Sequence, residues 1–216
     1  MELFRPETTL PTVSSSIAGA VETAAKRFVR QWGFTTLTTV AGSFRLTRRT
    51  LAPREVLARR ALDARADVAW LEPTREWFSL SDVPSAPGRA AAKVFAVAGS
   101  VAPAELAAAL GKRHSFGSAP PAVVDAYVSL LAARPLAAAA LEPEEGTLVE
   151  WLRVLGGLAE RRALFALGAA RGLPRKILRQ VLAASPLFLP AGRGVVRLVG
   201  ASLAMLPSPA PWAVAH

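Results

Sequence analysis

The chain uses one order of elements more than once, and this repeat limits its fold more than any single segment does. "PREVLARRALDARADVAWLEPTREWFSL" (53–80) and "LPRKILRQVLAASPLFLPAGRGVVRL" (173–198) each place a segment of helical periodicity before two short apolar runs around a turn. A Pro near each start suits the first turn of a helix, and the paired apolar runs predict a β-hairpin. The predicted inner faces are Val56, Leu57, Ala61 and Leu62 in the first copy, and Ile177, Leu178, Val181 and Leu182 in the second.

Two further helices are predicted before each of these pairs. Residues 14–33 have an apolar face that includes Val21, Ala25 and Val29, and "GFTTLTTVAGSF" predicts a short second helix capped by Thr36 or Thr38. In the last third, "GTLVEWLRVLGG" and "LAERRALFALGAARG" predict two amphipathic helices. The sequence therefore predicts a helix–helix–helix–hairpin module at both ends of the chain.

The two copies align without large gaps. The hairpins superpose at an offset of 118 residues, with Trp70 on Phe188 and Arg75 on Arg193. The preceding helices align at an offset of 120, with Leu57 on Ile177, so a small indel is predicted between helix and hairpin.

The middle of the chain follows the same plan more loosely. Three helical segments, "PGRAAAKVFAVAGS", "VAPAELAAALGKRH" and "APPAVVDAYVSLLAARP", precede the apolar "PLAAAALEP", which has weak strand character. We expect a mainly α fold with short β-hairpins, built as a flexible segment (1–15), module 1 (16–82), a divergent module 2 (83–143), module 3 (144–200) and a C-terminal tail (201–216).

Three helices closed by a hairpin are the outline of a winged helix, a helix-turn-helix with an added β wing. "RFVRQWGFTTLTTVA", "VAWLEPTREWFSL" and "SPLFLPAGRGVVRLVG" resemble the winged-helix modules of bacterial proteins related to sigma-factor region 4 and to the HARE-HTH domain. The resemblance spans most of residues 17–200 and implies a tandem winged-helix protein that works on DNA in transcription, its regulation or genome defence.

The charge distribution agrees with a polyanionic partner. The net charge is +10, and it divides into +4 over residues 1–80, −1 over 81–145 and +7 over 146–216. Modules 1 and 3 are therefore the expected binders of double-stranded DNA, whereas the third helix of module 2 carries Asp125 and has no basic residue before Arg134. The predicted DNA-binding residues are Arg175, Lys176, Arg179, Arg193 and Arg197 in module 3, and Arg48, Arg49, Arg54, Arg59 and Arg60 in module 1.

Other interpretations of these residues stay open. Arginines on the helices of an Arg-biased chain can be solvated surface, and the aromatic residues Trp70, Trp77 and Phe78 fit an anchor between hairpin and helices better than a base-stacking platform. The loop "GKRHSFG" fits a plain helix connection, and "GRG" at 192–194 fits a hairpin turn because no helix follows it.

Several classes of function are not expected. The chain has no Cys and two His without metal-ligand spacing, and it has no P-loop, Rossmann or nucleophile-elbow pattern, so we expect no enzyme, cofactor, metal or small-molecule ligand. Without a signal-like start or a long apolar run, a cytoplasmic, nucleoid-associated protein with no membrane contact is expected. The rival function is a non-catalytic assembly subunit of a nucleoprotein complex, docking a protein through module 2 or through Trp212 in the tail.

Overall fold

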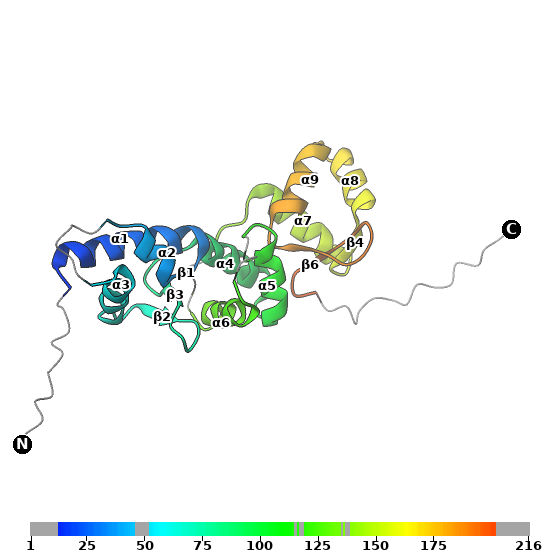
Figure 1. The fold of residues 1–216 in the computed structure, drawn as a ribbon. Helices are drawn as coiled ribbons and strands as arrows, with labels where there is room; N and C mark the ends of the chain where they lie inside the picture. Colours follow the sequence, from blue (N-terminus) through cyan, green and yellow to red (C-terminus); the bar gives the residue numbers. More distant parts are fainter. Residues whose placement is uncertain are drawn as a thin grey trace, which may run out of the picture. The chain divides into compact units, whose positions relative to one another are not determined.

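The computed structural model describes residues 13–45, 52–114, 116, 119–134, 136 and 139–201. These residues form nine α-helices and two small antiparallel sheets of three strands each, which confirms the predicted mainly α fold with short β elements (Figure 1). The chain divides into two compact units, an N-terminal unit of Met1–Ala86 and a C-terminal unit of Pro87–His216.

The N-terminal unit follows the order helix, strand, two helices and hairpin. Its elements are α1 (Ser15–Trp32), β1 (Thr35–Thr36), α2 (Leu37–Gly42), α3 (Arg54–Asp63), β2 (Val68–Trp70) and β3 (Trp77–Leu80). Side-chain caps set two of the helix starts, because the hydroxyl of Ser14 accepts from the Ile17 amide and that of Thr36 from the Thr39 amide. Thr36 was one of the two predicted caps, and the structure selects it.

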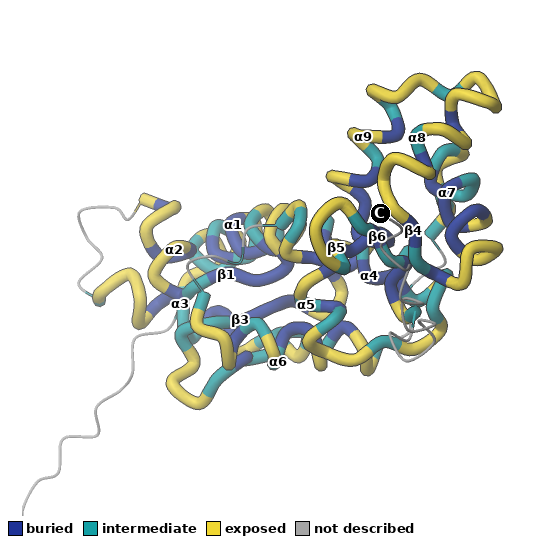
Figure 2. Tube along the Cα trace, turned by 90° about the vertical axis from the view of Figure 1, so that its right-hand side faces the viewer, coloured by how far each residue is buried: buried dark blue, intermediate teal, exposed yellow. Residues whose placement is uncertain are grey.

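One hydrophobic core holds this unit together (Figure 2). It joins the inner faces of the three helices to β3, whose Phe78 and Leu80 are almost completely buried. Leu57, Ala61 and Leu62 of α3 are buried as predicted, but Val56 is 40 % exposed and Ala58 takes its place. One of the four predicted positions is wrong because α3 packs on both α1 and α2, so the buried side of this helix is not centred on its most apolar side.

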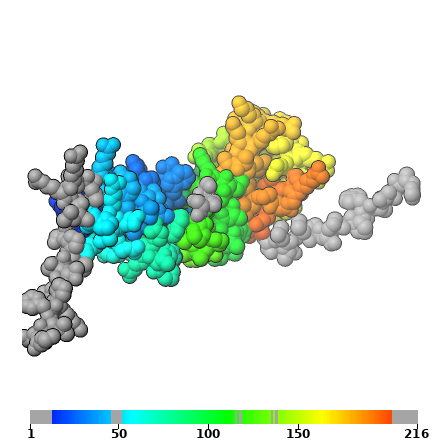
Figure 3. All heavy atoms as spheres, viewed as in Figure 1, coloured from blue at the N-terminus to red at the C-terminus, as the bar shows by residue number. Residues whose placement is uncertain are grey.

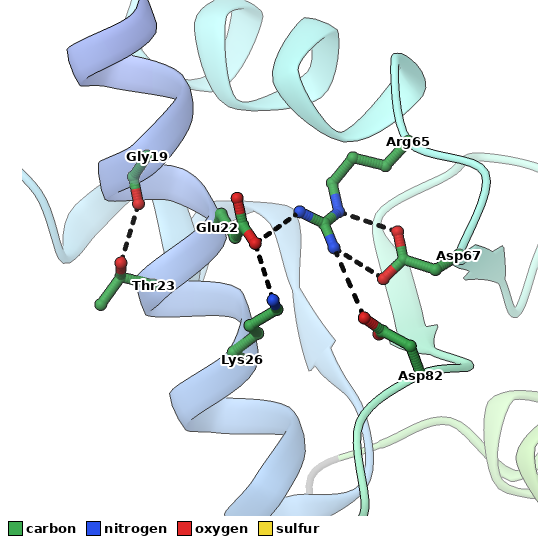
Figure 4. Close-up of polar contacts among 7 residues, drawn as sticks. All are labelled: Gly19, Glu22, Thr23, Lys26, Arg65, Asp67 and Asp82. Atoms are coloured by element: carbon green, nitrogen blue, oxygen red, sulfur yellow. Dashed lines mark hydrogen bonds and ion pairs between the residues drawn. The ribbon is translucent and has the colours of Figure 1, made fainter.

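Arg65 joins three segments of the N-terminal unit (Figure 4). Its guanidinium donates two hydrogen bonds to Asp67 at the start of the hairpin, Nε to Oδ1 at 2.9 Å and Nη2 to Oδ2 at 2.7 Å. It also lies 3.1 Å from Oε1 of Glu22 on α1 and 3.9 Å from Oδ2 of Asp82, which follows β3. A single side chain therefore connects α1, the α3–β2 turn and the end of the sheet.

The C-terminal unit contains six further helices and the second sheet. Its elements are α4 (Ala86–Ala98), α5 (Pro103–Gly111), α6 (Pro121–Ala132), α7 (Pro143–Val154), β4 (Leu158–Glu160), α8 (Arg161–Ala170), α9 (Arg175–Ala184), β5 (Phe188–Pro190) and β6 (Val195–Leu198). From α7 to β6 the order matches that from α1 to β3, and the strand orders β1-β3-β2 and β4-β6-β5 also match. The described part of the α6–α7 segment, residues 133–134, 136 and 139–142, contains no strand, so a hairpin predicted there for module 2 is not observed.

The short strands β1 and β4 were missed by the sequence interpretation, which predicted a helix over the whole of "LAERRALFALGAARG". Leu158–Glu160 instead pairs antiparallel with β6, and Arg161 opens the helix directly afterwards. Strands as short as these have no sequence pattern of their own, because they form only by pairing with the outer side of the second hairpin strand, β3 or β6.

The pairing register also corrects the predicted alignment of the hairpins. Val68 pairs with Leu80 and Phe188 pairs with Leu198, so Val68 corresponds to Phe188 and Trp70 to Pro190. The offset of 118 holds for β3 and β6, whereas β2 and β5 keep the offset of 120 found for the helices. The indel therefore lies in the hairpin turn, where six residues separate the first pair of strands and four the second.

Polar contacts within the C-terminal unit join α4 and α5 to the α7–β6 module. Glu105 of α5 forms an ion pair with Arg197 of β6 and accepts from the Gly200 amide at 3.0 Å. Lys93 of α4 lies 2.7 Å from the buried carboxylate of Glu145 on α7. Lys112 at the end of α5 donates to the carbonyls of Leu182, Ser185 and Phe188 at 2.7, 2.9 and 2.5 Å.

Candidate nucleic-acid interface

The exposed side of α9 carries three of the predicted DNA-binding residues. Leu178 and Leu182 are buried on the opposite side of the helix, which leaves Arg175, Lys176 and Arg179 exposed to solvent. None of these three side chains makes an ion pair with a residue that the structure describes. The period of the apolar residues thus predicted that this face is exposed, although Ile177 and Val181, also predicted to face inward, are only partly buried.

Beside α9, the start of α8 and the tip of the β5–β6 hairpin border an open hollow of about 500 Å³. We call it the arginine hollow; its lining residues are Glu160, Arg161, Arg162, Phe165, Arg175, Arg193 and Gly194. α8, α9 and the hairpin lie side by side in the space-filling view (Figure 3). Arg161 and Arg175 are the first residues of their helices, so the partial positive charge of two helix N-termini adds to that of the side chains.

Local backbone contacts place the arginines of the hollow. The Arg161 amide donates to the carbonyl of Gly194 at 2.8 Å, which ties the start of α8 to the hairpin tip. The tip can turn tightly because Gly192 and Gly194 have φ values of 138° and 78°, in the region that glycine tolerates. Arg193 stands between them and is exposed at the tip.

Side-chain contacts leave most of the positive charge in the hollow without a carboxylate. Glu160 is its one acidic lining residue and forms an ion pair with Arg162. The guanidinium carbon of Arg175 lies 4.9 Å from the ring centroid of Phe165, a cation–π contact that leaves its charge uncompensated. From residue 161 to residue 216 the sequence contains no Asp or Glu at all, so few local carboxylates can neutralise this face.

Arg197, also predicted to contact DNA, has a different environment. It is only partly exposed and its guanidinium is paired with Glu105 of α5. This carboxylate lies 92 residues earlier in the chain, and no local pattern could have identified it as the partner. Arg197 therefore joins the sheet to α5 instead of adding to the arginine hollow.

The equivalent face of the N-terminal unit is less available. Arg59 of α3 donates to the carbonyl of Arg75 at 3.1 Å and lies 5.8 Å from the Trp70 ring centroid, while Arg75 at the hairpin tip is 3.5 Å from Asp63. Arg54 is exposed and Arg60 is partly buried. Arg48 and Arg49 lie outside the described residues, as does Trp212 of the predicted partner-binding tail.

The hairpin aromatic residues serve the fold, as expected. Trp70 and Phe78 pack edge to face with ring centroids 5.5 Å apart, and Trp77 packs likewise against Phe34 at 5.7 Å. In the loop "GKRHSFG", Lys112 is occupied by three backbone carbonyls, and burial together with Arg113 and Arg89 lowers the pKa of His114. This loop is thus partly committed to packing within the C-terminal unit.

Sequence reasoning missed Arg161, Arg162 and Phe165 as members of the site. The signal was present as two consecutive arginines behind Glu160 at the head of a predicted helix, followed by a stretch without carboxylates. The sequence predicts a helix that already begins at Leu158, whereas α8 begins at Arg161, so the position of Arg161 at the helix N-terminus could not be recognised. A strand that ends at Glu160 is what brings both arginines to the hairpin tip.

Comparisons with protein-family models, with curated proteins and with solved structures return no match to this chain. Within the ranges that the structure describes, no helix has the length and apolar character needed to cross a membrane, and no three His, Asp or Glu side chains group as metal ligands.

Proposed function

We propose that the chain binds double-stranded DNA through module 3, with α9 in the major groove and the β5–β6 hairpin against the phosphate backbone. The observation that carries the proposal is the carboxylate-poor cationic face of α8, α9 and the hairpin. Six exposed basic side chains belong to it, namely Arg161, Arg162, Arg175, Lys176, Arg179 and Arg193. Arginine suits this role because its planar guanidinium pairs with phosphates and with guanine edges.

The order of elements supports a winged-helix assignment for modules 1 and 3. Helix, strand, helix, helix and hairpin, with the second hairpin strand in the centre of the sheet, recur in both. In helix-turn-helix proteins the third helix of such a unit is the one that reads base edges. We assign this part to α9 and, in module 1, to α3.

Module 1 would make a weaker second contact. Its Arg59 and Arg75 are engaged by neighbouring groups of the same unit, and freeing them would cost part of the binding energy. Arg54 is its exposed predicted contact within the described residues. We expect module 3 to dominate affinity and module 1 to contribute through proximity.

Salt dependence tests the proposal directly. Polarisation titrations with a random duplex should show log affinity falling by roughly 0.9 per phosphate contact for each unit of log salt, about 5 for six contacts. Between 50 and 200 mM salt the affinity should fall by about 10³. An absence of binding at 50 mM would refute the proposal.

A variant pair locates the contact. The charge-neutral variant R175Q/K176Q/R179Q should lower the salt slope by about 3, because three phosphate contacts are removed. The control R89Q/R113Q changes two exposed basic residues of the C-terminal unit outside the α9 face and should leave the slope within about 0.5 of the wild type. An equal loss in both variants would show that net charge alone, and not the α9 face, governs binding.

A second candidate function is an assembly subunit that uses this fold as a protein-docking surface. Val154 and Leu155 at the end of α7 favour it, because they are 87 % and 46 % exposed and stand next to each other. The variant V154S/L155S should leave the duplex titration unchanged. If it instead removes a partner that co-purifies with the wild-type chain, and the wild type does not bind duplex at low salt, the adaptor function replaces the first.

A further inference from the structure

The arginine hollow is more highly charged than contact with a DNA backbone requires. Four guanidiniums and one carboxylate line about 500 Å³, a net charge of +3 in a space the size of a small-ligand site. Each phosphodiester of a duplex carries one negative charge, and successive phosphates are spaced along the strand. A ligand that brings three or four charges together would neutralise this hollow much better.

The hollow is also organised before any ligand arrives. Arg175 stacks on Phe165, and the Arg161 amide is bonded to the carbonyl of Gly194 beside Arg193. The stacked Arg175 side chain loses less freedom on binding an anion than a mobile surface lysine does, and the backbone bond fixes where the Arg161 side chain starts relative to the hairpin tip. Three of the four, Arg161, Arg175 and Arg193, have no carboxylate partner among the described residues.

We infer that the arginine hollow binds a polyphosphate anion, of the kind carried by nucleoside triphosphates and by inorganic polyphosphate. Arg161, Arg175 and Arg193 contact the phosphate chain, and Phe165 provides an apolar wall beside it. The same arginines belong to the DNA face, so a bound polyphosphate competes with duplex. This competition rests on the proposed function, whereas the binding of the anion does not.

The roles of the basic residues separate by position. Arg161 and Arg193 line the hollow, but Lys176 and Arg179 do not, although all four are exposed on module 3. The double variants R161Q/R193Q and K176Q/R179Q remove the same charge from inside and outside the hollow. All four side chains are exposed, so both variants are expected to fold, which circular dichroism checks.

The test is calorimetric titration of the full chain with inorganic tripolyphosphate, without Mg²⁺ and at 50 mM salt. We expect one site per chain, an affinity at least tenfold lower in R161Q/R193Q, and a change of less than threefold in K176Q/R179Q. Orthophosphate should bind at least tenfold more weakly than tripolyphosphate. Absence of saturable binding, or equal losses in the two variants, would overturn the inference.

The sources of the anion and the two proposals are told apart in the same experiment. ATP binding at least threefold tighter than tripolyphosphate identifies a nucleotide site, because the base and ribose then add contacts, whereas equal affinities identify the phosphate chain alone as the ligand. If tripolyphosphate binds and duplex does not, the hollow stands and the DNA function fails. If duplex binds and tripolyphosphate does not, the DNA function stands and the hollow is overturned.

Discussion

Replacing Arg65 by Met should destabilise the N-terminal unit by about 2 kcal/mol. The side chain makes two charge-assisted hydrogen bonds to Asp67 and an ion pair with Glu22, and it is 21 % exposed. Hydrogen bonds to charged groups contribute roughly 1.5–3 kcal/mol when buried and less when solvent screens them, and Met keeps most of the apolar stem. In a unit of this size, about 2 kcal/mol lowers the Tm by about 10 °C.

The loss should depend on pH in a defined direction. The hydrogen bonds from Arg65 hold the pKa of Asp67 below its ordinary value, and Lys26 with Arg65 does the same for Glu22. A depressed carboxyl pKa stabilises the fold above the unfolded pKa of about 4, and this stabilisation is lost as the pH falls through the folded value. The gap between wild type and R65M should therefore be complete at pH 7 and shrink below about pH 4.

Urea unfolding followed by Trp fluorescence measures this gap. Trp151 and Trp212 would be changed to Phe in every variant, so that emission reports the N-terminal unit. R30M is the matched control, because Arg30 is exposed on α1, and its effect should stay within about 0.5 kcal/mol. A gap below about 0.5 kcal/mol for R65M, or one that is the same at pH 7 and pH 3.5, would refute the role given to Arg65.

Three further predictions concern the packing of α8, the first hairpin turn and β6. Gly168→Ala should destabilise the C-terminal unit by about 1–2 kcal/mol although Ala favours a helix, because the new Cβ would lie 2.2 Å from Cδ1 of buried Leu178. Gly19→Ala on α1 is the comparison: its Cβ meets nothing within 4 Å, so this variant should be more stable than the wild type by up to about 1 kcal/mol. Thermal unfolding measures both variants. The hydrogen bond from Thr74, together with backbone amides of the turn, lowers the pKa of Glu72 to about 2. The stability that the ionised Glu72 provides is therefore present above the unfolded pKa and is lost as the pH falls through about 2. Thr74→Val should raise the midpoint of Glu72 in an NMR titration, and an unchanged midpoint would contradict this. Arg197→Gln should lower the stability of the C-terminal unit but leave the salt dependence of duplex binding unchanged, since Arg197 is paired with Glu105. Arg193→Gln should do the opposite: the slope of log affinity against log salt falls by about 1 and the stability stays the same.

The candidate site could be predicted in part because its largest element is local. The period of Leu178 and Leu182 turns Arg175, Lys176 and Arg179 outward whatever the rest of the chain does. The arginine hollow could not be predicted in this way, because it needs the start of α8 beside the hairpin tip. That proximity follows from the pairing of β4 with β6, a contact between segments distant in sequence.

The sequence by itself determined the order of the helices and the two hairpins β2–β3 and β5–β6, and it limited the cap of α2 to Thr36 or Thr38. It also determined which sides of α1 and α9 face inward, since each of these features depends on residues within one or two turns of each other. Tertiary structure decided which arginines remain available. Arg197 is paired with Glu105 and Arg59 is bonded to the carbonyl of Arg75, whereas Arg161 and Arg193 meet at an open hollow. The charge of a side chain follows from the residue type, but whether another group neutralises that charge depends on which residues the fold places beside it.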